Sequence, residues 1–231
     1  MILRSLLLLT PDSDAAFDEA AASGADALAV DATGANPEAL RRTAVFLAGQ
    51  PDNAVFLLVG PPTAAETLAA LDALVPARPA GVAFAAEGGA DVTRLSALIR
   101  PREAMAGIAD GATRIIALAT GTPAAVLALA TYAGASRRLT ALAWDDAPLA
   151  AALAAEDARD VALYARTGTL IAAAAAGVAA LDRPFRGTDR AALAAEAEAA
   201  RRAGFAGKLA RTPDQIAILN RAFGRTAGSS S

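Results

Sequence analysis

Short, uninterrupted runs of apolar residues recur along the whole chain and are separated by longer segments with helical spacing. Such runs predict parallel strands covered on both faces, because strands with one solvent face alternate apolar and polar residues. Eight runs are found, at residues 4–9, 27–32, 55–60, 81–86, 114–120, 140–144, 179–181 and 208–211. Helical segments are expected at residues 13–22, 37–48, 64–74, 90–99, 124–132, 149–176 (a double segment), 189–203 and 214–223.

Several of these helices have clear start signals. Asn36 precedes Pro37, and Thr122 precedes Pro123, so each pair places a capping side chain before a proline at the first helical position. Eight strand-then-helix units in a row predict a closed (β/α)₈ barrel, the TIM barrel of the α/β class. An open doubly wound sheet is the alternative, but the G-x-G-x-x-G loop that such sheets often carry after the first strand is missing.

Length and charge narrow the classes of protein further. The 231 residues fit one barrel domain, expected over 1–226, followed by a disordered tail at 227–231. A net charge of −3 argues against a nucleic-acid or acidic-membrane partner, since such partners usually require a basic surplus. The uncharged stretch 115–136 is broken by Gly121 and Pro123, which favours a buried strand and a helix over a membrane span. With no signal-peptide features, a cytoplasmic location is expected.

Two residue types that often carry chemistry are missing. The chain has no cysteine, which excludes disulfides, thiolate nucleophiles and cysteine metal sites. It also has no histidine, so Ser-His-Asp catalysis and histidine zinc sites are excluded. Proton transfer would have to use a carboxylate, a tyrosine, an arginine, water or Lys208, the only lysine. Because Lys208 opens the last predicted strand, it is expected at the end of the barrel away from the active-site face.

The segment GFAGKLARTPDQIAILNRAF, residues 204–223, resembles the closing segment of the citrate lyase β-subunit-like branch of the HpcH/HpaI aldolase family. That family has a strand of the form G-K-x-x-I-H-P-x-Q followed by a helix ending V-N-x-x-F. The matching positions here are Gly207, Lys208, Pro213, Gln215, Asn220 and Phe223. Residues 3–34 are similar to the family's first strand, helix and second strand. The resemblance implies a phosphoenolpyruvate/pyruvate-type barrel, here without the family's C-terminal extension or with a shortened one.

The same resemblance implies a magnesium-dependent carbon–carbon lyase of oxoacids and acyl-CoA thioesters, but its functional positions are changed here. Thr120 stands where the family's first metal-binding glutamate is expected, and Pro148 where the aspartate is expected. Leu58 replaces the arginine that would hold a substrate carboxylate, Ala85-Ala86 replaces a Pro-Lys pair, and Thr212 replaces a histidine. The loss of both carboxylates, the arginine and the lysine makes efficient family chemistry improbable, because one preorganised charge typically contributes on the order of 10²–10³-fold in rate.

Seven residues remain as candidates at the strand ends. Asp31, Asp145 and Asp146 are candidate catalytic or cation-binding carboxylates, although turn formation and helix starts are the more common reasons for aspartate at such positions. The candidates for ligand binding are Arg4, Thr33, Thr120 and Thr212. Threonine is also a common strand-end residue, and an arginine at a barrel rim is commonly an ion-pair partner.

Two hypotheses follow. In the first, the protein is a non-catalytic or weakly active barrel of this lineage that needs no cofactor and binds an oxoacid or acyl-CoA ligand, or serves as a structural partner of an active relative. In the second, it is an active carbon–carbon lyase or aldolase with a rebuilt Mg²⁺ site that uses Asp31, Asp145 and Asp146. The resemblance also implies self-association, as a trimer or a multiple of three.

Overall fold

In the computed structural model, eight parallel strands form a closed barrel, and each strand pairs with its neighbours in chain order. The structure describes residues 3–49 and 54–224. The strands are β1 (Ser5–Leu9), β2 (Ala27–Asp31), β3 (Ala54–Val59), β4 (Gly81–Ala85), β5 (Arg114–Leu118), β6 (Leu139–Ala143), β7 (Ala179–Asp182) and β8 (Gly207–Ala210). Pairing of β8 with β1 closes the sheet. The predicted (β/α)₈ barrel is confirmed, and every strand lies within two residues of its predicted bounds.

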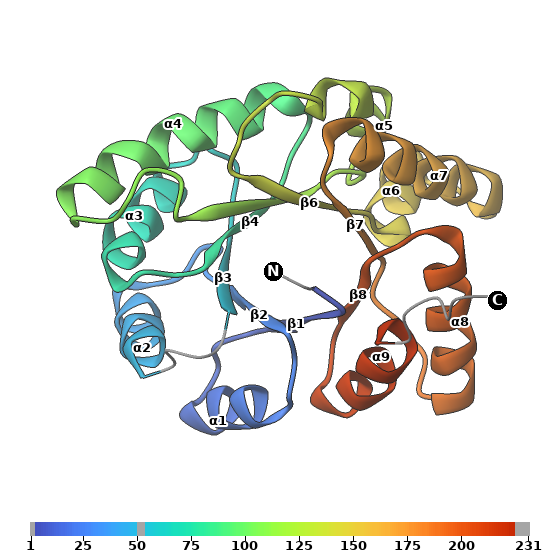
Figure 1. The fold of residues 1–231 in the computed structure, drawn as a ribbon, viewed down its shortest axis with the longest axis horizontal. Coiled ribbons are helices and arrows are strands. Elements are labelled where there is room, and N and C mark those ends of the chain that lie inside the picture. Colours follow the sequence, from blue (N-terminus) through green and yellow to red (C-terminus); the bar gives the residue numbers. More distant parts are fainter. Residues whose placement is uncertain (1–2, 50–53, 225–231) are drawn as a thin grey trace, which may run out of the picture.

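The helices surround the barrel as an outer ring (Figure 1). They are α1 (Asp14–Ala22), α2 (Pro37–Ala48), α3 (Ala65–Leu74), α4 (Gly89–Met105), α5 (Pro123–Leu127), α6 (Asp146–Leu153), α7 (Arg159–Ala176), α8 (Arg190–Ala203) and α9 (Ile216–Phe223). Short 3₁₀ turns lie at η1 (Val75–Ala77), η2 (Leu129–Tyr132) and η3 (Pro213–Gln215). The predicted start signals act as expected, since Asn36 accepts a hydrogen bond from the amide of Ala39 and Thr122 from that of Ala125.

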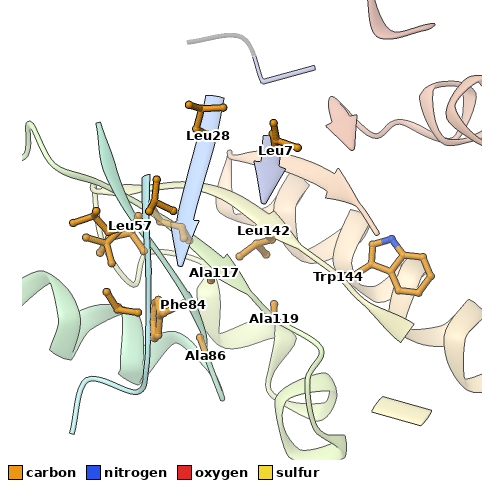
Figure 2. Packing of buried hydrophobic residues seen from close by; sticks show 14 of the residues in the cluster. Leu7, Leu28, Leu57, Phe84, Ala86, Ala117, Ala119, Leu142 and Trp144 are labelled. Atoms are coloured by element: carbon orange, nitrogen blue, oxygen red, sulfur yellow. The ribbon is translucent and has the colours of Figure 1, made fainter. Parts of the chain in front are cut away.

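Residues along each strand face alternately into the barrel and outward, and this alternation creates two cores. The interior core consists mainly of alanine and leucine side chains, such as Leu6 and Leu209, with one large ring, Phe56. The larger outer core lies between strands and helices, and Figure 2 shows part of it, with Leu57 and Phe84 among its members. Gly81 faces Phe56 across the β3–β4 pair, where a Cβ atom would lie 2.5 Å from the Phe56 ring, so only glycine fits there.

Two helices differ from the prediction because tertiary contacts outweigh local signals. The segment 90–99 is longer than expected: α4 continues through Pro101 to Met105. The last turns of α4 bury Glu103, whose carboxylate accepts hydrogen bonds from Arg138 and from two loop amides. These contacts offset the loss of the backbone hydrogen bond that Pro101 cannot donate. The predicted helix at 124–132 is divided into α5 and η2. The double segment at 149–176 is indeed two helices, separated at Ala154, whose positive φ of 49° ends α6.

Two further expectations concern the C-terminal tail and membrane-spanning helices. The tail at 227–231 lies outside the described residues. Within 3–49 and 54–224, none of the helices combines the length and hydrophobicity that crossing a lipid bilayer requires.

Candidate functional site

The carboxyl ends of the eight strands meet at one end of the barrel, the mouth, which is where barrels of this class place functional groups. On β1, β3 and β5 the last interior-facing side chains are Leu8, Leu58 and Leu118, all half-buried and packed on the interior core. These three strand ends therefore present hydrocarbon. A set of paired charged groups lies around the ends of β6 and β7.

Thr120 joins β5 to the segment after β6. Its hydroxyl accepts a hydrogen bond from the backbone amide of Asp145 at 2.9 Å and donates one to the backbone carbonyl of the same residue at 3.1 Å. Thr120 is buried, and both its hydrogen-bonding capacities are used by the backbone. The structure thus brings two of the predicted residues together, but in a positioning contact between loops.

Asp145 and Asp146 both bind arginines from the loop after β7. Nη2 of Arg186 lies 2.5 Å and 2.6 Å from the two carboxylate oxygens of Asp145, and its Nη1 lies 3.0 Å from Asp146. Arg183 forms an ion pair with the same Asp146. Burial alone would lower the pKa of Arg186, but the hydrogen bonds and charges of Asp145 and Asp146 outweigh it and raise that pKa. Both carboxylates are therefore neutralised by guanidinium groups.

This pairing continues to β8 through buried charges. Nζ of Lys208 lies 2.7 Å from Asp182, the last residue of β7, and 2.6 Å from Glu196 on α8. Glu196 in turn lies 3.5 Å from Arg183. The seven residues that share these contacts form what we call the rim network: Asp145, Asp146, Asp182, Arg183, Arg186, Glu196 and Lys208.

The backbone of Lys208 lies where it was predicted, at the start of β8, where it pairs with Ser5 at the start of β1 and its amide donates to the carbonyl of Arg4. Its contact with the end of β7 was not predicted. The register pairs it with Asp182, because the strands of a barrel are staggered relative to one another. Its neighbour Leu209 belongs to the interior core, so the lysine points outward toward α8 and is fully buried there. The lysine is held between two carboxylates and faces away from the barrel interior, which argues against a Schiff-base role.

A cavity of about 690 Å³ opens beside the rim network, between α6, α7 and α8. Trp144 follows β6 on the same outer face as Leu142 (Figure 2) and lines this cavity. The Trp144 ring is buried, and its Nε1 donates a hydrogen bond of 2.7 Å to Asp182. Arg166 on α7 also lines the cavity and lies 3.9 Å from Asp182, so most of its donors are not used by that contact.

The remaining predicted residues lie apart from this group. Asp31 accepts hydrogen bonds from the amide and the hydroxyl of Thr33, which is the turn-forming arrangement considered from the sequence. Thr212 donates to Asp214 within the turn after β8. Arg4 lies at the opposite end of the barrel, before β1, where it is bound to Asp26 at 2.6 Å. The structure does not bring Arg4 together with the three threonines.

The donor set does not fit a hard divalent cation. In the described parts of the chain, no group of three or more Asp or Glu side chains is arranged to hold a metal ion. Strands β2 and β6 are four strands apart in a barrel of eight, which places Asp31 across the mouth from Asp145 and Asp146. Pro148 lies on the exposed side of α6 and offers no side-chain oxygen. Mg²⁺ requires free carboxylate oxygens, and those near β6 are occupied by arginines.

With this geometry established, the chain can be compared with known proteins. No family model matches it, and a search of curated proteins gives no match. Solved structures are similar over nearly the whole barrel. The citrate lyase β subunit of M. tuberculosis, complexed with oxaloacetate and magnesium, gives a TM-score of 0.79 at 24% identity, covering 97% of this chain and 98% of that one. The chain has the fold of citrate lyase β subunits.

Two other solved structures support the same assignment of the fold. RipC from Yersinia pestis gives a TM-score of 0.77 at 23% identity over 99% of this chain and 98% of its own. CitE from Mycobacterium tuberculosis, in complex with magnesium, acetoacetate and coenzyme A, gives a TM-score of 0.77 at 24% identity, covering 96% of this chain and 81% of that one.

The sequence analysis did not single out Arg186. The segment R-P-F-R-G that follows β7 has two arginines close to a strand end, and this was the signal that could have indicated it.

Proposed function

We propose that this chain is a ligand-binding barrel of the citrate lyase β-subunit type in which magnesium-dependent carbon–carbon cleavage is lost or very weak. The observation that carries this proposal is the pairing of Asp145 and Asp146 with Arg183 and Arg186. Carboxylates that could serve a cation are already neutralised by protein cations, and the pairing is continuous with a buried ionic network.

Cleavage of an oxoacid or thioester needs a group that stabilises developing negative charge on the substrate carbonyl oxygen. It also needs an anchor for the substrate carboxylate. The hydrocarbon of Leu58 lines the mouth where the anchoring arginine would stand, and the hydroxyl of Thr120 is held by backbone. Neither substitution supplies charge. Losing each such group costs on the order of 10²–10³-fold in rate, so losing both leaves little acceleration.

We infer that the ligand is a small oxoacid or the thioester of one, bound in the cavity beside the rim network. A volume of about 690 Å³ falls in the range of small-molecule sites. Arg166 lines this cavity, and its guanidinium lies 4.9 Å from the centroid of the Phe205 ring. A guanidinium suits a carboxylate, which it can bind through two parallel hydrogen bonds. The similar structures carry oxaloacetate, acetoacetate and coenzyme A, which are ligands of this class.

Trp144 permits a direct test, because it is the only tryptophan in the chain and lines the cavity. Titration with oxaloacetate, acetoacetate or coenzyme A should change its emission saturably for at least one ligand. Arg166→Gln should weaken that binding by about tenfold, the equivalent of 1.4 kcal/mol, and the matched control Arg202→Gln on exposed α8 surface should not. No saturable change with any ligand up to about 10 mM, a concentration that detects even weak sites, would count against the binding role.

A further inference from the structure

The end of the barrel opposite the mouth carries an arginine-rich cavity that the proposed function does not use. It has a volume of about 450 Å³ and lies between α4 and the loops that lead into β5 and β6. It is lined by Ser96, Arg100, Asp110, Gly111, Arg114, Ser136, Arg137 and Arg138. Barrels of this class place their functional groups at the mouth, so the fold alone does not explain why four arginines gather at the opposite end.

One of the four arginines is part of the fold. Arg138 is 4% exposed, and its Nη1 and Nη2 lie 2.8 Å and 2.6 Å from the two carboxylate oxygens of Glu103. Its Nη2 also lies 2.6 Å from Asp110. Glu103 is further held by the amides of Gly111 and Thr113. This fully bonded group forms a rigid wall of the cavity.

The other three arginines line the cavity and are exposed to solvent. Among the described residues, Arg100, Arg114 and Arg137 form no ion pair. The side chain of Arg114 makes one long hydrogen bond, 3.4 Å, to the carbonyl of Arg137. Four arginines against Asp110 and Glu103 leave a formal excess of two positive charges, in a protein whose net charge is −3.

Two serines complete the polar lining. Ser136 accepts a hydrogen bond from the amide of Arg138 and donates one of 3.1 Å to the hydroxyl of Ser96. Ser96 therefore keeps its own hydroxyl hydrogen for an acceptor in the cavity. Three guanidinium groups from α4, β5 and the loop before β6, with one hydroxyl, present donors from several directions.

We propose that this cavity is a binding site for a small phosphate-bearing anion, separate from the mouth. A phosphate group carries about −1.5 to −2 charge at neutral pH, which matches the excess of two, and has three oxygens that accept hydrogen bonds. A carboxylate carries a single charge on two oxygens and would leave part of the cluster unbalanced. Arginine is the side chain best suited to binding phosphate oxygens in pairs.

The test is calorimetric titration at low salt with inorganic phosphate, pyrophosphate and citrate, the last as a polycarboxylate comparison. The wild type should bind pyrophosphate most tightly and citrate most weakly. Arg100→Gln/Arg114→Gln/Arg137→Gln should weaken pyrophosphate binding by at least about tenfold. The charge-matched control Arg41→Gln/Arg94→Gln/Arg202→Gln should change it less than about twofold, the effect of net charge alone. All six side chains are exposed, so both variants should fold.

Hydrogen exchange then locates the site: pyrophosphate should protect amides around Ser96 and Ser136 and leave those around Trp144 unchanged. The proposal is overturned if the two triple variants lose affinity equally, or if citrate binds as tightly as pyrophosphate. It is also overturned if the first variant keeps its affinity, or changes only the sedimentation of the protein, since the cluster would then be a contact between copies. None of these readouts depends on the fate of the oxoacid proposal.

Discussion

Nη2 of Arg186, in the loop after β7, lies 2.5 Å and 2.6 Å from the two carboxylate oxygens of Asp145, which caps the helix after β6. The contact joins two loops of the barrel mouth that are 41 residues apart in sequence. It also places a permanent cation beside a carboxylate that the hypothesis of a rebuilt Mg²⁺ site would assign to the metal ion. The proposed loss of magnesium-dependent cleavage follows from this arrangement, in which an arginine stands where that metal ion would have to bind.

Removing the arginines should create an affinity for divalent cations that the wild type lacks. In Arg183→Gln/Arg186→Gln, the carboxylates of Asp145 and Asp146 lose their partners, and adjacent free carboxylates attract hard cations. We expect Mn²⁺ affinity, measured by electron paramagnetic resonance, to rise by at least about tenfold. Adding Asp145→Asn and Asp146→Asn should abolish the gain. Equal Mn²⁺ binding by the wild type and the double variant would show that the arginines do not occupy the cation's place.

The buried pair of Glu103 and Arg138 should contribute strongly to stability. Glu103→Gln leaves Arg138 in a buried position with only the half-exposed Asp110, so unfolding free energy should fall by about 3 kcal/mol. Glu38→Gln, which breaks an exposed pair with Arg41, is the control and should cost less than about 1 kcal/mol. Urea denaturation measures both. Similar losses of unfolding free energy in the two variants would contradict the prediction that the buried pair contributes more than the exposed one.

The same pair predicts a dependence on pH. Burial alone would raise the pKa of Glu103, but hydrogen bonds from Arg138, Thr113 and Gly111 outweigh it and lower that pKa below its usual 4.5. The contribution is therefore complete above about pH 4.5 and is lost as pH falls through the lower, folded-state value. The stability difference between wild type and Glu103→Gln should shrink over that acidic range. If the stability difference between the two proteins instead grew as the pH fell, the pKa of Glu103 would be raised in the folded state and the prediction would be wrong.

The repeating apolar runs were enough to predict the barrel. Each strand is covered on both faces, so its sequence is a short continuous apolar run, which differs from the spaced apolar positions of the surrounding helices. The charged rim was harder to predict. Arg186 and Asp145 are separated by 41 residues, and Lys208 reaches the rim only through the stagger of β7 and β8. Neither the pairing of distant charges nor the stagger of strands has a local sequence pattern. The continuation of α4 past Pro101 likewise depends on Glu103 finding a partner 35 residues away.

Self-association in multiples of three stays a prediction from the resemblance. The described surface offers apolar area for it on α7, where Tyr164 is 63% and Ile171 66% exposed. Tyr164→Glu/Ile171→Glu should shift the protein toward monomer in sedimentation equilibrium, because burying two new charges in an interface is costly. Asp160→Asn, on the same helix, should leave the distribution unchanged. A wild type that sediments as a concentration-independent monomer would end the prediction.

The central claim is that the mouth has exchanged a metal site for an arginine–carboxylate network. Its most direct test is turnover of citramalyl-, malyl- and citryl-thioesters by the wild type with Mg²⁺ present, alongside calorimetric titration of Mg²⁺ itself. The account predicts no Mg²⁺ binding tighter than about millimolar and at most traces of cleavage. Micromolar Mg²⁺ binding together with turnover above about 1 s⁻¹, the low end for ordinary enzymes, would contradict it and establish an active lyase with a rebuilt site.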